Sequence, residues 1–187
     1  ECGWGDAEDK AGVERLADRP GLTVTEMISR AGADIRALYI MAENPMLSDP
    51  DATHVQESLQ KLDFLVVQDI FLTETARLAH LVLPGACFAE KAGTFTNTER
   101  RFQLLRRAVS PPGGALDDFA VLRRMSEALG VPVPDADPAA AMEEIGALCP
   151  AYGGIRHECL ERTGLQWPCP EPDHPGTRFL HRDRFTR

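Results

Sequence analysis

The sequence predicts an α/β fold in which helices flank an open, mostly parallel, Rossmann-like sheet, followed by an extended, proline-rich C-terminal arm. The first observation is that three short apolar runs, at residues 36–41, 64–67 and 81–84, alternate with segments of helical periodicity. Parallel strands need crossover connections and are covered on both faces, so they read as nearly continuous apolar runs. The second observation is that each run is too short to form a helix of its own.

Helical segments connect the three runs. The first predicted helix covers residues 24–33. The second extends to about residue 62 and follows Asp49-Pro50-Asp51, where acidic residues and proline favour the start of a helix. A short helix over residues 73–79 precedes the last run. Because consecutive strands usually become neighbours, we expect a parallel sheet with the second strand in the centre.

The pattern changes in the second half of the chain. Residues 90–107 show no clean period. Residues 117–129 predict a helix with one apolar face, and Gly130 is its stop signal. A further helix is predicted over residues 138–148. From Gly164 onward, four prolines describe an extended arm on the surface.

The composition argues against several classes of protein. A net charge of −9 and a pI near 5.0 disfavour a nucleic-acid partner, which needs a basic stripe on the surface. No stretch approaches the roughly 20 apolar residues that cross a bilayer, and the first residues do not resemble a secretory leader. We therefore expect a cytoplasmic protein with no membrane span and no nucleic-acid partner.

The cysteines and histidines do not suggest a metal site. Five cysteines lie far apart, without the C-x-x-C pairs of zinc and iron–sulfur sites, and no two of the five histidines are three or four residues apart. We expect free thiols. The chain begins at Glu1 without an initiator methionine and ends after a proline-rich stretch, which suggests an internal fragment of a longer protein.

Polar residues follow each apolar run, and they are the candidates for a ligand site. Ligands of open α/β sheets bind beyond the carboxyl ends of the strands. The residues there are Glu43-Asn44-Pro45, Gln68-Asp69 and Pro84-Gly85-Ala86. A carboxylate can accept two hydrogen bonds from a guanine edge or from ribose hydroxyls, so this edge suits a nucleotide. The alternative is that Asn44 and Asp69 are helix caps and turn formers, which the pattern alone favours.

The densest polar motif covers residues 93–101, and it shows neither a nucleophile with its base nor a phosphate-binding loop. Four arginines lie in or close to this motif, and they could meet phosphates. A solvated helix face or an intersubunit salt bridge is the commoner role for such charges. The arginines are Arg100, Arg101, Arg106 and Arg107.

Four stretches together resemble the molybdopterin oxidoreductase superfamily: residues 37–45, 65–76, 82–84 and 90–103. Within it, residues 67–71 and 94–101 look like the formate dehydrogenase large subunit. The closing residues 165–177 are similar to the linker that leads into the family's C-terminal cofactor-binding barrel. The resemblance divides the chain into a weakly matched segment 1–20, part of a Rossmann-like domain at 21–150, and a helix with an extended linker at 151–187.

The resemblance implies an enzyme that oxidises formate to carbon dioxide at molybdenum or tungsten held by bis(molybdopterin guanine dinucleotide). It also implies an iron–sulfur cluster elsewhere in the longer protein, and possible iron–sulfur or flavin subunits as electron-transfer partners. The family's metal ligand, with its neighbouring histidine and arginine, precedes the matched part. We therefore expect this chain to carry no catalytic residue and to be inactive alone.

By position, the resemblance implies guanosine contacts in three loops and at one helix start: Asn44 and Ser48, Gln68 and Asp69, Gly85, and Asp118. The chain departs from the family pattern at three points. Ala42 stands where glycine is usual, Gly85 where serine or alanine is common, and Ala92 where an acidic residue is usual. Ala42 matters most, because a β-carbon is strained if the backbone there has a positive φ.

Two alternatives remain open from the sequence. The chain could be a cofactor-free scaffold in the large iron–sulfur subunit of a respiratory NADH dehydrogenase, which is expected to have the same fold. Retention of the proposed dinucleotide contacts argues against that interpretation. The chain could also be a stand-alone nucleotide-binding or interaction module, for which an initiator methionine and a self-contained sheet edge would be expected.

Overall fold

The computed structural model describes residues 20–131 and 137–181. These residues form two compact units. The sheet unit comprises residues 20–90 and 109–131, and the hairpin unit comprises residues 91–108 and 137–181. The chain therefore enters the hairpin unit, returns to the sheet unit and leaves it again, so neither unit is continuous in sequence.

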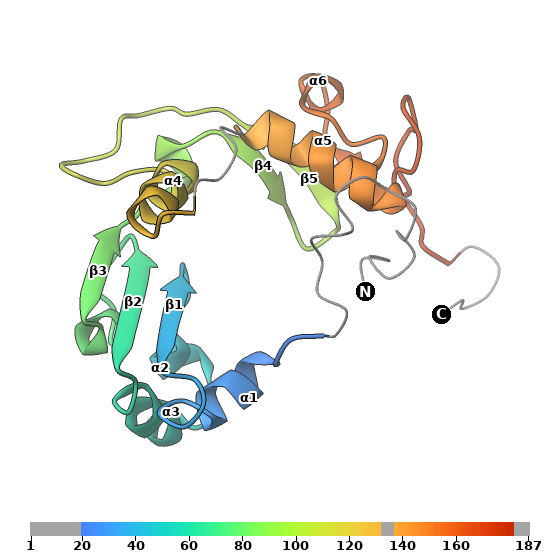
Figure 1. Cartoon of the computed structure of the whole chain (residues 1–187). Coiled ribbons are helices and arrows are strands. Elements are labelled where there is room, and N and C mark those ends of the chain that lie inside the picture. Colours follow the sequence, from blue (N-terminus) through green and yellow to red (C-terminus); the bar gives the residue numbers. More distant parts are fainter. Residues whose placement is uncertain (1–19, 132–136, 182–187) are drawn as a thin grey trace. The chain divides into compact units, whose positions relative to one another are not determined.

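The sheet unit contains the parallel sheet that the apolar runs predict. Its strands are β1 (Ala37–Met41), β2 (Phe64–Asp69) and β3 (Leu81–Pro84), in the order β1-β2-β3. Both pairings are parallel, with Tyr39 opposite Val66 and Gln68 opposite Leu83. All three arrows in Figure 1 point the same way. The prediction of three parallel strands with the second in the centre is confirmed.

Helices connect and cover this sheet. They are α1 (Val24–Ser29), α2 (Pro45–Ser48), α3 (Ala52–Leu59), the 3-10 turns η3 (Ala76–Leu78) and η4 (Phe88–Glu90), and α4 (Asp118–Ala128). Thr23 caps α1 in a capping box with Glu26, and the Asp51 carboxylate caps α3 by accepting from the His54 amide.

Three of the predicted helices are shorter in the structure. Helix α3 ends at Leu59 and not at about residue 62. Helix α1 ends before residue 33, because the chain turns at Gly32, whose φ is +78°. The helix predicted over residues 73–79 is only the single 3-10 turn η3. All three predictions were right in position and too long.

One face of the sheet packs against α1 and α3. Leu65 and Val67 point to this side and are buried with Val55 and Leu59 of α3 and Ile28 of α1. The other face holds Val66 and Gln68, since neighbouring side chains of a strand alternate between faces. Helix α4 lies beyond the carboxyl ends of the strands (Figure 1).

The predicted end of the 117–129 helix is confirmed. Gly130 has a φ of +70°, and its amide donates to the Glu127 carbonyl at 3.1 Å. The Val131 amide donates to the Ser126 carbonyl at 3.0 Å. This is the Schellman arrangement in which a glycine ends a helix.

The hairpin unit is built on a small antiparallel sheet, which the sequence did not reveal. Its strands are β4 (Gly93–Thr96), β5 (Arg101–Leu105) and β6 (Leu165–Gln166), in the order β4-β5-β6. Residues 90–107 lack a clear period because β4 and β5 are short and only Phe102 among their residues is buried. The unit also contains α5 (Pro138–Leu148), as predicted, with the 3-10 turn η5 (Pro150–Tyr152) and α6 (His157–Leu160).

The segment after Gly164 is extended as expected, but its first part, residues 164–169, packs into the hairpin unit, and only the residues after Cys169 are largely exposed. Cys169 is completely buried in a cluster with Phe102 and Ile155. Backbone hydrogen bonds hold the segment in place, from the Gly154 amide to the Cys169 carbonyl at 2.7 Å and from the Thr177 amide to the Gln166 carbonyl at 2.7 Å. Proline removes backbone donors without preventing an extended segment from packing into a core.

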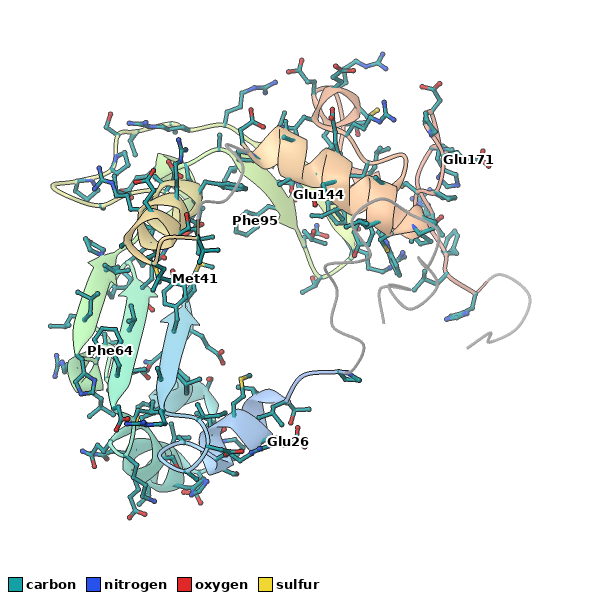
Figure 2. The ribbon with its side chains drawn as sticks, viewed as in Figure 1. Glu26, Met41, Phe64, Phe95, Glu144 and Glu171 are labelled. Carbon is teal, nitrogen blue, oxygen red and sulfur yellow. The ribbon has the colours of Figure 1, made fainter. Side chains whose placement is uncertain are left out.

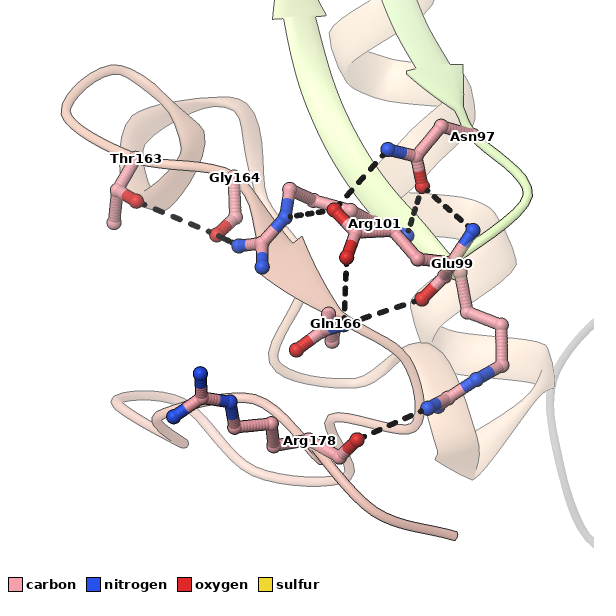
Figure 3. Close-up of polar contacts among 8 residues, drawn as sticks. Asn97, Glu99, Arg101, Thr163, Gly164, Gln166 and Arg178 are labelled. Atoms are coloured by element: carbon pink, nitrogen blue, oxygen red, sulfur yellow. Dashed lines mark hydrogen bonds and ion pairs between the residues drawn. The ribbon is translucent and has the colours of Figure 1, made fainter.

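The arginines of this region lie on the hairpin and not on a surface helix. The Arg101 guanidinium donates to the Glu99 carboxylate at 2.8 Å and to the Gly164 carbonyl at 3.0 Å (Figure 3). Arg100 donates to the carbonyls of Trp167, Thr177 and Arg178. Arg106 pairs with Glu161 at 3.2 Å. These contacts tie β5 to the C-terminal segment, so these arginines have structural partners within the unit.

Two features are absent from the part of the chain that the structure describes. No helix in residues 20–131 and 137–181 has the length and apolar character to cross a membrane. In the same residues, no group of three or more histidine, cysteine, aspartate or glutamate side chains is placed to hold a metal ion.

Candidate functional site

The six predicted contact residues lie at the end of β2, in the segments that follow β1 and β3, and at the start of α4. Asn44 lies in the loop after β1, and Ser48 is the last residue of α2. The end of β2 holds Gln68 and Asp69, and Gly85 follows β3. The sixth, Asp118, is the first residue of α4. Figure 1 shows the three arrowheads ending toward α4, so the residues that directly follow the strands share one end of the sheet unit. Figure 2 shows the side chain of Met41, the last residue of β1, at the same end.

A backbone bridge brings Asp118 to this edge. Leu116 pairs with Gly85 in an isolated parallel bridge, in which the Ala86 amide donates to the Leu116 carbonyl at 2.9 Å. The Leu116 amide in turn donates to the Pro84 carbonyl at 3.2 Å. Asp117 then caps α4 by accepting from the Ala120 amide at 2.9 Å. The bridge and the cap together fix where α4 begins and place Asp118 beside β2.

Gln68 is the centre of the polar contacts at this edge. It is only 2% exposed, although it lies near the end of a strand. The NH2 group of its side-chain amide donates to the Asp118 carboxylate at 2.7 Å, and the amide oxygen accepts from the Tyr39 hydroxyl. Burial raises the pKa of the Tyr39 hydroxyl, and the charge of Asp118 raises it further, so the hydroxyl stays protonated and able to donate.

Gly85 lies against the same amide. A β-carbon at this position would lie 3.5 Å from Cγ and 3.6 Å from Nε2 of Gln68, which is ordinary van der Waals contact. The described residues therefore do not themselves require glycine at position 85. Gln68, Gly85 and Asp118 form one cluster, which is hereafter called the amide cluster.

Asn44 lies in a different set of contacts. Its side-chain oxygen accepts from the Thr75 hydroxyl at 2.6 Å and from the Thr75 amide at 3.3 Å. The NH2 group of its side-chain amide donates to the Glu74 carboxylate at 2.9 Å, a bond that lowers the pKa of Glu74. Thr75 is fully buried and its hydroxyl also accepts from the Met46 amide at 3.2 Å. Asn44 thus ties the loop after β1 to the loop after β2.

Asp69 and Ser48 have local partners. One oxygen of the Asp69 carboxylate accepts from the Phe71 amide at 3.0 Å. This bond forms an Asx turn, which aspartate commonly makes. The exposed Ser48 hydroxyl donates to the Glu43 carboxylate at 3.2 Å. The structure therefore groups three of the six predicted residues in the amide cluster and gives Asn44, Ser48 and Asp69 separate bonds.

Three side chains at this edge are new relative to the sequence predictions: Tyr39, Glu74 and Thr75. Tyr39 lies inside an apolar strand, where its hydroxyl was the one polar side-chain group and hence the available signal. Thr75 and Glu74 belong to the predicted 73–79 helix and gave no signal that they face Asn44, because that contact joins residues 30 or more positions apart.

Comparison with known proteins now identifies the family. The family model described as molybdopterin oxidoreductase matches residues 6–128, which is more than half of the chain. The chain belongs to the molybdopterin oxidoreductase family. The resemblance seen in the sequence is thereby confirmed.

Relatives of this molybdopterin oxidoreductase chain include the F420-dependent formate dehydrogenase subunit alpha of Methanocaldococcus jannaschii, which is 52% identical over 177 residues. That match covers 91% of this chain and 26% of the relative. Formate dehydrogenase H of Escherichia coli is 32% identical over 178 residues, covering 93% and 25% of the two chains. The chain thus spans about a quarter of the length of these relatives.

A solved structure supports the fold. Acetylene hydratase from Pelobacter acetylenicus superimposes with a TM-score of 0.58 at 22% sequence identity. The match covers 74% of this chain and 20% of that one. At this level of identity the likeness shows that the fold is shared, and it agrees with the α/β architecture described above.

Ala42 has the strained backbone that its departure from the family pattern suggested. Its φ is +56°, in the left-handed region that favours glycine, and its amide donates to the Gln68 carbonyl at 2.8 Å. An L-residue with a β-carbon is disfavoured there by about 1–2 kcal/mol. The chain keeps this conformation because the bond to β2 fixes the turn from β1 into the Glu43-Asn44-Pro45 loop.

We predict that Ala42→Gly stabilises the protein by roughly 0.5 to 1 kcal/mol, because it removes the left-handed strain while adding some entropy to the unfolded chain. Urea unfolding followed by circular dichroism measures the change. Ala37→Gly is the matched control, since the same substitution in the extended backbone of β1 should destabilise by about 0.5–1 kcal/mol. Equal destabilisation by both variants would contradict the strain at Ala42.

Proposed function

We propose that this chain is part of a molybdenum- or tungsten-dependent formate dehydrogenase and contacts the guanine end of its bis(molybdopterin guanine dinucleotide). The observation that carries the proposal is the amide cluster, in which Gln68 holds the Asp118 carboxylate at the carboxyl edge of a parallel sheet. That edge is where open α/β sheets bind ligands. Similarity to formate dehydrogenase alpha subunits supports the identity of the cofactor and of formate as the substrate of the longer protein.

The chemistry of the side chains fits a guanine. The Watson–Crick edge of guanine presents two neighbouring donors, and an ionised carboxylate is an acceptor with two oxygens. Adenine lacks this pair of donors, so a carboxylate discriminates between the two purines. The surrounding structure fixes the position of the Asp118 carboxylate, because the NH2 group of the Gln68 amide and the Gly85–Leu116 bridge both restrain it.

The other predicted contacts have secondary roles in this proposal. Asp69 uses one carboxylate oxygen for its turn, and the second oxygen is proposed to accept from the nucleotide. Asn44 holds the loop after β1 against Thr75, and Ser48 is proposed to contact the nucleotide from the end of α2. Gly85 allows close approach of a ligand to the backbone.

When bound, the cofactor supplies the metal centre at which formate is oxidised to carbon dioxide. The residues of this chain are proposed to bind and orient the nucleotide end and to take no part in the chemical step. An iron–sulfur cluster elsewhere in the longer protein, with iron–sulfur or flavin subunits as partners, is proposed to receive the electrons.

The proposal is tested by cofactor analysis of the full-length protein and of Asp69 variants. Asp69→Asn keeps the side-chain oxygen that closes the turn to Phe71 but removes the carboxylate charge. We predict a roughly ten- to hundredfold loss of cofactor retention, as expected for a lost charge-assisted hydrogen bond worth about 1.5–3 kcal/mol, with little change in melting temperature. The measurement is metal and guanosine monophosphate released per mole of protein.

Asp69→Ala is the matched comparison, because it removes the turn as well as the charge. Loss of a cap-like hydrogen bond costs about 0.5–2 kcal/mol of stability, so this variant should also have a lowered melting temperature. Normal cofactor content in both variants, with only the melting temperature of Asp69→Ala lowered, would show that Asp69 is a turn former alone. A full-length wild-type protein without metal or pterin would favour the cofactor-free scaffold instead.

We also predict that the purified 187-residue chain does not oxidise formate. The reason is that the family's metal ligand and its neighbouring acid–base residues precede the matched part, so the groups that carry out the reaction are expected outside this chain. A dye-reduction assay with formate measures this directly, with the full-length protein as the positive control. Turnover by the isolated chain would contradict the assignment of a binding role.

A further inference from the structure

We infer that Tyr39 is a positioning residue of the nucleotide site. Its hydroxyl fixes the Gln68 side-chain amide so that the NH2 group of that amide faces Asp118. The inference rests on the proposed function, and it adds a residue that is not itself expected to touch the nucleotide. Tyr39, Gln68 and Asp118 come from β1, β2 and α4, so one chain of hydrogen bonds joins three elements of the sheet unit.

The sheet register brings the first two side chains together. Tyr39 is paired with Val66, two residues before Gln68 on the neighbouring strand. Side chains two residues apart on a strand share a face, so Tyr39 and Gln68 lie on the same side of the sheet. A tyrosine side chain is long enough to cross this offset, and its hydroxyl reaches the Gln68 side-chain oxygen.

Chemistry determines which way the amide points. The two ends of a glutamine amide are similar in size, so steric fit alone does not select one orientation. An ionised carboxylate only accepts hydrogen bonds, so the NH2 group of the Gln68 amide must face Asp118. The oxygen of the Gln68 amide must then face a donor. The protonated Tyr39 hydroxyl is that donor.

Burial makes this arrangement consequential. At 2% exposure, Gln68 has little access to water that could replace a lost partner. Removing the Tyr39 hydroxyl leaves a buried oxygen without its donor, and such a group tends to move toward another one. Any such movement pulls the NH2 group of the Gln68 amide away from the Asp118 carboxylate. Tyr39 thereby controls how firmly the carboxylate is held for a guanine.

The experiment uses full-length protein loaded with its cofactor. Tyr39→Phe retains the ring and removes only the hydroxyl, and guanosine monophosphate and metal are measured in the protein after a series of dialysis times. We expect cofactor to be lost roughly two- to tenfold faster than from the wild type, the effect of one neutral hydrogen bond. Tyr152→Phe removes the only other tyrosine hydroxyl of this chain, in the hairpin unit, and is the matched control.

A second background separates positioning from general loosening of the fold. In Gln68→Leu protein the amide is absent, so adding Tyr39→Phe should cause no further acceleration of cofactor loss. Non-additivity of this kind is expected when one residue acts through another. An equal acceleration in both backgrounds, or none in either, would overturn the inference. If Tyr39→Phe alone folds poorly, Gln68→Leu alone still tests the inference, because it removes the amide through which Tyr39 acts. Normal cofactor retention by Gln68→Leu would overturn the inference.

Asp118→Ala separates failure of this inference from failure of the proposed function. Loss of cofactor from Asp118→Ala with normal retention by Tyr39→Phe would overturn only the role of Tyr39. Normal retention by Asp118→Ala would show that the amide cluster does not hold the nucleotide, and the inference would fall together with the role of this cluster in the proposed function.

Discussion

The side-chain amide of Gln68 is buried near the end of the central strand, where both of its ends must be hydrogen-bonded within the protein. Tyr39 on β1 satisfies one end and Asp118 on α4 satisfies the other. This requirement joins two neighbouring strands to a helix residue that lies 50 positions later in the chain. The hydrogen bonds of Gln68 therefore connect β1, β2 and α4 at the carboxyl edge of the sheet. A second set of bonds holds the loops at the same edge, since Asn44 and Thr75 connect the loops after β1 and β2. Loops tied in this way lose little further freedom when a ligand binds, which favours retention of a cofactor.

The sequence predicted the parallel sheet because its strands are short, continuous apolar runs, and it predicted the bounds of α5 because Pro138 and Pro150 mark its ends. It did not predict the hairpin over residues 93–105, since these short strands bury few side chains and carry no alternating pattern. The packing of Cys169 was missed for a related reason, because proline content indicates an extended chain and gives no information on whether that chain is buried.

The candidate site was predictable in its position and less so in its bonding. Topology places Asn44, Gln68 and Gly85 at one edge, and the resemblance to the family added Asp118. The sequence could not show that Asn44 would bond to Thr75, or that Tyr39 would reach Gln68, because these contacts depend on strand register and loop geometry. The local turn at Asp69 was the alternative considered from the sequence, and the structure contains it.

The central claim is that this edge holds the guanine of a molybdopterin dinucleotide. An experimental structure of the full-length protein loaded with metal and pterin tests it most directly. The account predicts a guanine whose donors lie within hydrogen-bond distance of the Asp118 carboxylate. The NH2 group of the Gln68 amide should still donate to that carboxylate. A loaded structure in which Asp118, Gln68 and Asp69 all lie out of hydrogen-bond reach of the dinucleotides would contradict it.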